Sequence, residues 1–162
     1  MFKTTSKAFI TSLLLSSCTY YTNPPAPLHE ITNTDNGITI VNTQFNEKPK
    51  IYSSDGITTH TTNYKAWTDI VINKVRNILP KTTQVKVLKI GIRSIVCSGS
   101  FVADCIIITE IEIGSGYKNL ITTERRHGHY IGGGNSALTK AIDESAQQIA
   151  TNQAVLKYLF NK

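Results

Sequence analysis

The stretch most suggestive of a reactive or ligand-binding site is ERRHGHYIGGGNS, residues 124–136. If it forms a strand, His127 and His129 share one face, because strand side chains alternate, and two imidazoles on one face can bind a metal ion. A zinc site needs a third or fourth ligand, for which His60 is the nearest candidate, and the sequence alone does not place it. The triglycine before a predicted helix could instead hold an anion, with Arg125 or Arg126 nearby.

These candidate sites do not follow an established motif. The triglycine lacks the Lys-Ser/Thr pair of a P-loop and the spacing of a dinucleotide fingerprint. No serine lies in a Gly-x-Ser-x-Gly elbow. Glu110 and Glu112 share a strand face, which is more typical of a solvated surface than of a catalytic carboxylate pair. We therefore expect no enzymatic activity, no metal and no cofactor, and the stretch to be a flexible connection from strand to helix.

The cysteines offer a different chemistry. Cys97 and Cys105 enclose seven residues and could form a disulfide in an oxidising compartment. Cys105 also falls on the apolar face of a predicted strand, where a free cysteine is a common small hydrophobic residue. Both alternatives stay open. The third cysteine, Cys18, follows the leucines and serines of LLLSS.

The first 17 residues have the pattern of a secretory signal peptide. Lys3 and Lys7 supply a basic start without acidic residues, and a short apolar run follows at residues 8–15. A membrane-spanning helix needs about 20 apolar residues, so this run is too short to span and fits the apolar region of a signal peptide.

Leu15-Ser16-Ser17-Cys18 resembles the lipobox of bacterial lipoproteins. In that motif the cysteine thiol takes a diacylglyceryl group, and after cleavage the cysteine becomes the N-terminus and is N-acylated. The resemblance implies lipid, palmitate included, on Cys18 and a permanent membrane anchor. Thr19 stands where an aspartate would imply inner-membrane retention, so the resemblance favours the outer membrane and a periplasm-facing domain.

The composition limits the partners of the mature chain. The 162 residues carry a formal net charge of +6, but the two leader lysines account for part of it, which leaves 15 basic against 11 acidic residues. No basic stripe with interleaved aromatic residues occurs, so we expect no nucleic-acid binding. We expect a membrane, reached through the lipid, and a protein partner in the cell envelope.

The chain divides into a signal peptide at residues 1–17, a lipidated flexible tether rich in proline at 18–36, and one domain at 37–162. Within the domain the apolar spacing predicts the following elements: a strand at 38–45, a hairpin at 51–62, a helix at 63–79, strands at 85–96, 101–114 and 117–131, and a helix at 136–160. A slip in apolar phase predicts a bulge near Leu88. Asn135 or Ser136 should cap the last helix.

This order predicts an α+β fold, in which two helices pack on one face of an antiparallel sheet to form a two-layer sandwich. The tether, the helix YKAWTDIVINKVRNIL and the closing ALTKAIDESAQQIATNQAVLKYL resemble those of small proteobacterial lipoproteins. Two groups are similar over about residues 50–160: auxiliary lipoproteins of ABC-type transport, and the YajG-type and penicillin-binding-protein-activator lipoproteins. The similarity is one of pattern, and no binding residue is carried over from it.

The resemblance implies a non-enzymatic accessory or binding subunit of a transport or wall-synthesis machine. Two alternatives remain. The protein could carry a periplasmic lipid or other ligand on its apolar sheet face, or it could be a metal-dependent envelope enzyme that uses His127 and His129.

Overall fold

The computed structural model describes residues 18–22, 37–46, 48–54, 58–82, 85–99, 102–114, 116–128 and 133–160. The elements are β1 (Cys18–Thr22), β2 (Ile38–Asn42), β3 (Lys50–Ser54), β4 (Thr58–Thr62), α1 (Tyr64–Ile78), β5 (Lys86–Ser98), β6 (Val102–Ile113), β7 (Lys118–Gly128), α2 (Gly133–Thr151) and α3 (Gln153–Phe160). None of these helices is long and apolar enough to cross a membrane.

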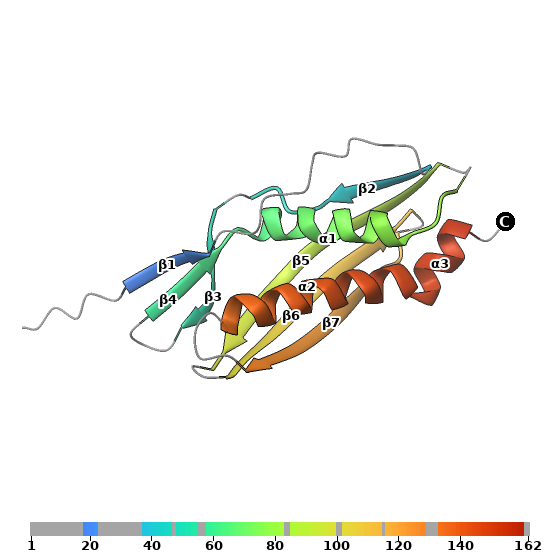
Figure 1. Cartoon of the computed structure of the whole chain (residues 1–162). Coiled ribbons are helices and arrows are strands. Elements are labelled where there is room, and N and C mark those ends of the chain that lie inside the picture. The colour runs from blue at the N-terminus through green and yellow to red at the C-terminus, as the bar shows by residue number, and fades with distance from the viewer. Residues whose placement is uncertain are drawn as a thin grey trace, which may run out of the picture.

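The strands form two sheets, and the α+β class is confirmed (Figure 1). The larger sheet has the order β2-β5-β6-β7, and the smaller one has the order β1-β4-β3. Strands β5, β6 and β7 are antiparallel, as is the hairpin β3–β4. The predicted single antiparallel sheet is thus divided in two, and each part contains one parallel pair, β2 with β5 and β1 with β4.

Both long helices pack on the four-stranded sheet. Helix α1 contacts β2 and β5, α2 contacts β6 and β7, and the two helices contact each other. Figure 1 shows them side by side in front of this sheet. The core between the layers is made of fully buried aliphatic side chains, among them Val71 and Val75 of α1, Ile90 and Ile107 of the sheet, and Leu138 and Ile142 of α2.

Helix α1 has the predicted length because both of its ends are specified locally. The Asn63 side chain accepts a hydrogen bond from the Ala66 amide at 3.1 Å, which satisfies one of the unpaired donors of the first turn. Leu79 is extended, with ψ of 134°, because Pro80 disfavours a helical residue before it.

The C-terminal helix differs from the prediction, since it begins earlier and is divided in two. Helix α2 starts at Gly133, so the predicted caps Asn135 and Ser136 lie within its first turn. The division falls at Asn152, whose side-chain oxygen accepts hydrogen bonds from the Ala154 and Val155 amides and thereby caps α3.

The bulge in β5 lies further along the strand than predicted. Pairing with β6 is regular from Leu88 to Ile92, and the register shifts between Ile92 and Ser94. The predicted position at Leu88 was wrong because it relied on Val85, which lies outside the strand and is exposed.

Strand β2 covers only the first half of the β5 edge, and side chains cover the next part. The β2 pairing ends where Asn42 faces Ile90. Beyond that point Gln44 Nε2 donates to the Ile92 carbonyl at 2.8 Å, and the Ile92 amide donates to Thr68 Oγ1 at 3.2 Å.

Tyr64 of α1 satisfies the last part of this edge. Its hydroxyl oxygen accepts a hydrogen bond from the Ile95 amide at 3.0 Å, and its hydroxyl donates to the Ile95 carbonyl at 3.2 Å. Burial raises the pKa of the Tyr64 phenol, an effect that its hydrogen bond with Ile95 partly offsets, so the group keeps the proton that it donates. Tyr64 thus takes the place of a neighbouring strand residue.

We expect Tyr64→Phe to lower the free energy of unfolding by about 1–3 kcal/mol, because it leaves the Ile95 amide and carbonyl buried without a partner. Tyr117→Phe, at an exposed residue, is the matched control and should change stability by less than about 0.5 kcal/mol. Urea denaturation measures both. Equal stability of the two variants would show that the Tyr64 hydroxyl does not hold the β5 edge.

Candidate functional site

The predicted lipidation residue is the first residue of a folded strand. Cys18 opens β1 and faces Thr58 in the parallel register with β4. The far end of β1 is held by Thr22, whose hydroxyl forms a 2.7 Å hydrogen bond with the Tyr52 hydroxyl and whose carbonyl accepts from Thr62 Oγ1 at 2.8 Å. The first five residues of the predicted tether therefore belong to the smaller sheet. Residues 1–17 and 23–36 lie outside the described residues.

Aromatic side chains connect β1 to the rest of this sheet. The ring of Tyr20 stacks on that of His60, with 5.6 Å between centroids and 22° between planes. Tyr52 belongs to β3, the other neighbour of β4, and its ring centroid lies 6.0 Å from that of His60. Tyr52 is buried, and β3 contacts β5, so this aromatic row joins the smaller sheet to the body of the domain.

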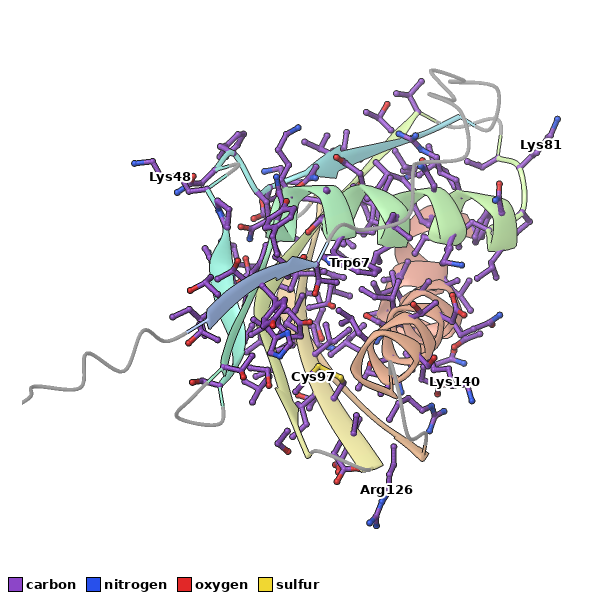
Figure 2. The ribbon with its side chains drawn as sticks, turned by 60° about the vertical axis from the view of Figure 1, so that its left-hand side comes forward. Lys48, Trp67, Lys81, Cys97, Arg126 and Lys140 are labelled. Carbon is purple, nitrogen blue, oxygen red and sulfur yellow. A yellow bond between two sulfur atoms is a disulfide. The ribbon has the colours of Figure 1, made fainter. Side chains whose placement is uncertain are left out.

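The candidate anion or metal site in residues 124–136 is not assembled by the described residues. Arg125 forms an ion pair with Glu144 of α2 at 2.5 Å, whereas Arg126 forms one with Asp104 of β6 at 3.5 Å. Neighbouring residues of a strand point to opposite faces, so the two guanidinium groups diverge. Figure 2 shows Arg126 pointing away from the helices. The hydrogen bond from Arg125 also lowers the pKa of the Glu144 carboxyl.

The histidines of this stretch are only partly placed. His127 faces Ala103 in the register of β6 and β7. His129 and the glycine at position 132 lie outside the described residues, and so does the predicted flexible connection around them. Within the part of the chain that the structure describes, no group of three or more His, Cys, Asp or Glu residues is close enough to hold a metal ion.

Cys97 and Cys105 form a disulfide bond. They face each other directly across the β5–β6 ladder, and both are buried on the side of the sheet that packs against the helices. Figure 2 draws the bond at Cys97. Of the two alternatives that the sequence left open, the structure contains the disulfide, which closes the turn between the two longest strands.

Glu110 and Glu112 lie on the outer face of the larger sheet, the face away from the helices, and both are held in ion pairs. Both carboxylate oxygens of Glu110 accept hydrogen bonds from the Arg93 guanidinium, at 2.6 and 3.0 Å, and these bonds lower the Glu110 pKa. Hydrogen bonds from Lys89 and Lys118 lower the pKa of Glu112 in the same way. These carboxylates thus stay ionised as surface partners.

The same outer face carries apolar side chains that solvent reaches, which we call the outer strip: Val96, Ile106, Ile108 and Leu120. Val96 and Ile106 are direct cross-strand partners, and the exposed fractions of Val96 and Leu120 are 53% and 57%. Partly exposed apolar side chains in a polar, ion-paired rim are typical of a surface that another molecule covers.

The outer strip was not predicted, although the sequence contains a signal for it. The alternation of Glu110 and Glu112 with buried residues indicated a polar outer face. The run Cys-Ile-Ile-Ile at residues 105–108 breaks that alternation, and an unbroken apolar run places hydrophobic side chains on both faces of a strand.

Comparisons with known proteins give no family. No family model matches the chain, and no curated protein matches it. A solved structure titled "Crystal structure of uncharacterized protein" aligns over 70% of this chain and 86% of its own, with a TM-score of 0.35 and 9% identity. That likeness is too low to support any argument about this chain.

Removing the disulfide tests its structural role. We expect Cys97→Ala/Cys105→Ala to lose about 2–3 kcal/mol of unfolding free energy, because the disulfide restricts the unfolded chain, and the short closed loop keeps the loss below that of a long loop. Denaturant titrations with and without reductant measure this loss. Reductant should shift the wild-type curve toward that of the double variant and leave the variant unchanged. Coincident curves for all four samples would show that the bond adds no stability.

Proposed function

We propose that the protein is a lipoprotein anchored to the outer membrane, which faces the periplasm and acts as a non-enzymatic binding or accessory subunit of a cell-envelope machine. The observation that carries the proposal is that the lipobox-like motif ends at Cys18, where β1 begins. Cleavage before Cys18 would leave the whole described domain intact, with the lipid at the first residue of β1.

The outer strip supports a binding role. The helices cover one face of the larger sheet, so its other face is available to a partner. Ile106 in its middle faces Val96 on β5 and Glu124 on β7, and ion pairs such as Arg93–Glu110 lie further along the strands. A surface with an apolar centre and a charged rim is suited to a protein rather than to a small charged substrate.

The disulfide supports the proposed compartment. Disulfides persist in oxidising environments such as the bacterial periplasm, and Cys97–Cys105 is buried in the core. The class of machine, transport or wall synthesis, comes from the resemblance of the two helical segments to auxiliary lipoproteins and remains part of the proposal.

Site-specific photo-cross-linking in the native cells tests the binding role. A photoreactive residue at Leu120 should give an adduct with an envelope protein, because Leu120 is an exposed member of the outer strip. The same residue at Val85, which is apolar and exposed but lies outside the strip, is the matched control and should give little or none.

The anchor is tested in the same strain. Cys18→Ser should remove the Leu120 adduct, since an unanchored or unprocessed chain no longer meets its partner at the membrane. Two results would contradict the proposal. One is the absence of any adduct from both Leu120 and Val96 at normal protein levels, and the other is an undiminished adduct in the Cys18→Ser strain.

A further inference from the structure

We propose that the three-stranded sheet β1-β4-β3 rests on the lipid headgroups of the membrane that holds Cys18, through an exposed row formed by Tyr21 and Ile51. This inference rests on the proposed lipidation of Cys18 and adds to it the surface with which the domain meets the membrane. A sheet that rests on the headgroups would fix the orientation of the domain relative to the membrane, whereas a long flexible tether would leave that orientation free.

The row lies close to the anchor residue. Tyr21 is three residues beyond Cys18 in a continuous strand. At about 3.3 Å per residue its Cα lies roughly 10 Å from that of Cys18. The headgroup region of one leaflet is about 5–8 Å thick, since the bilayer measures 40–45 Å and its hydrocarbon core about 30 Å. A lipid on Cys18 therefore brings Tyr21 to the membrane surface.

Tyr21 and Ile51 lie on one face of the smaller sheet. In the registers of the smaller sheet Thr61 faces Tyr21 on one side and Ile51 on the other. Residues that face each other across strands share a face, so Tyr21 and Ile51 flank Thr61 on one surface. Their exposed fractions are 46% and 62%. A tyrosine ring with its hydroxyl, next to an isoleucine, suits the boundary between headgroups and acyl chains.

The strands of the smaller sheet carry little formal charge. Of the residues in β1, β3 and β4, Lys50 is the one with a formal charge at neutral pH, whereas β7 contains Lys118, Glu124, Arg125 and Arg126. Approach to a bilayer thus desolvates few charged groups. Lys50 faces Thr62 and so lies on the opposite face from Tyr21 and Ile51, with its ammonium over the Tyr64 ring at 4.9 Å.

Aromatic side chains link the smaller sheet to the body of the domain. Tyr20, His60 and Tyr52 form the aromatic row on the opposite face, and Tyr52 is buried against the body. Figure 1 shows the smaller sheet at one end of the molecule and α3 at the other. The turn between β6 and β7 belongs to the α3 end, because Gly114 lies against Tyr158 of α3. Contact through β1 and β3 would hold that end away from the membrane.

Fluorescence quenching in vesicles tests this orientation. Single substitutions Tyr21→Cys and Ile51→Cys are made in the acylated full-length protein, and Tyr117→Cys is the matched control. Tyr117 is 47% exposed, close to the value for Tyr21, and lies in the β6–β7 turn. The introduced thiol is the one available to an environment-sensitive dye, because Cys97 and Cys105 are bonded and Cys18 would be acylated.

The labelled proteins are reconstituted into vesicles of phosphatidylethanolamine and phosphatidylglycerol that contain a nitroxide-headgroup lipid. We expect the quenched fraction at positions 21 and 51 to be several-fold larger than at position 117. The fluorescence of buried Trp67 shows whether each variant is folded, and Ile51→Cys keeps the test valid if Tyr21→Cys disturbs β1.

Equal quenching at all three positions of a membrane-attached, acylated protein would overturn this inference and leave the proposed lipoprotein function standing. A mass spectrum that shows Cys18 without lipid would overturn both. Strong quenching at 21 and 51 with weak quenching at 117 would support the proposed contact.

Discussion

The incomplete pairing of β5 is the constraint on which the other parts of the domain depend. This 13-residue strand lies in the middle of the larger sheet, yet β2 pairs only with its first half. An uncovered strand edge leaves backbone donors and acceptors without partners, and these groups can pair with a strand of another chain. The side chains of Gln44, Thr68 and Tyr64 satisfy this edge instead.

This solution joins three parts of the fold. Tyr64 and Thr68 belong to the first turns of α1, so the helix is held at the β5 edge as well as by its apolar contacts. The chain reaches Tyr64 directly from β4, which places the smaller sheet beside the uncovered half of β5. The Trp67 indole also donates to Thr62 Oγ1 at 2.8 Å and so ties α1 to the end of β4. The position of Cys18 follows, because β1 pairs with β4.

The sequence predicted well what depends on local periodicity. Helix α1 was correct because its apolar stripe, Asn63 and Pro80 all act within a few residues. The α+β class and the three long antiparallel strands were also correct. The bulge was misplaced because the alternation continues regularly to Ile92, and the helix break at Asn152 was missed because an asparagine cap does not interrupt the apolar pattern.

Features that depend on distant pairing could not be read from the sequence. The parallel pair of β1 and β4 joins residues about 40 positions apart, and the CTYYT segment is too short to indicate a strand by itself. The divergence of Arg125 and Arg126 requires knowledge of what lies on each face of β7. The outer strip required the register of β5 and β6, which places Val96 opposite Ile106.

The proposed function depends on the lipid attached to Cys18. The mass of the mature N-terminal peptide tests this attachment most directly. Protein is isolated from the membranes of its own cells, digested, and its N-terminal peptide is analysed by mass spectrometry. The account predicts a peptide that begins at Cys18 and carries a diacylglyceryl group and an N-acyl chain. A mature chain that begins elsewhere, or a Cys18 peptide without lipid, would contradict the account.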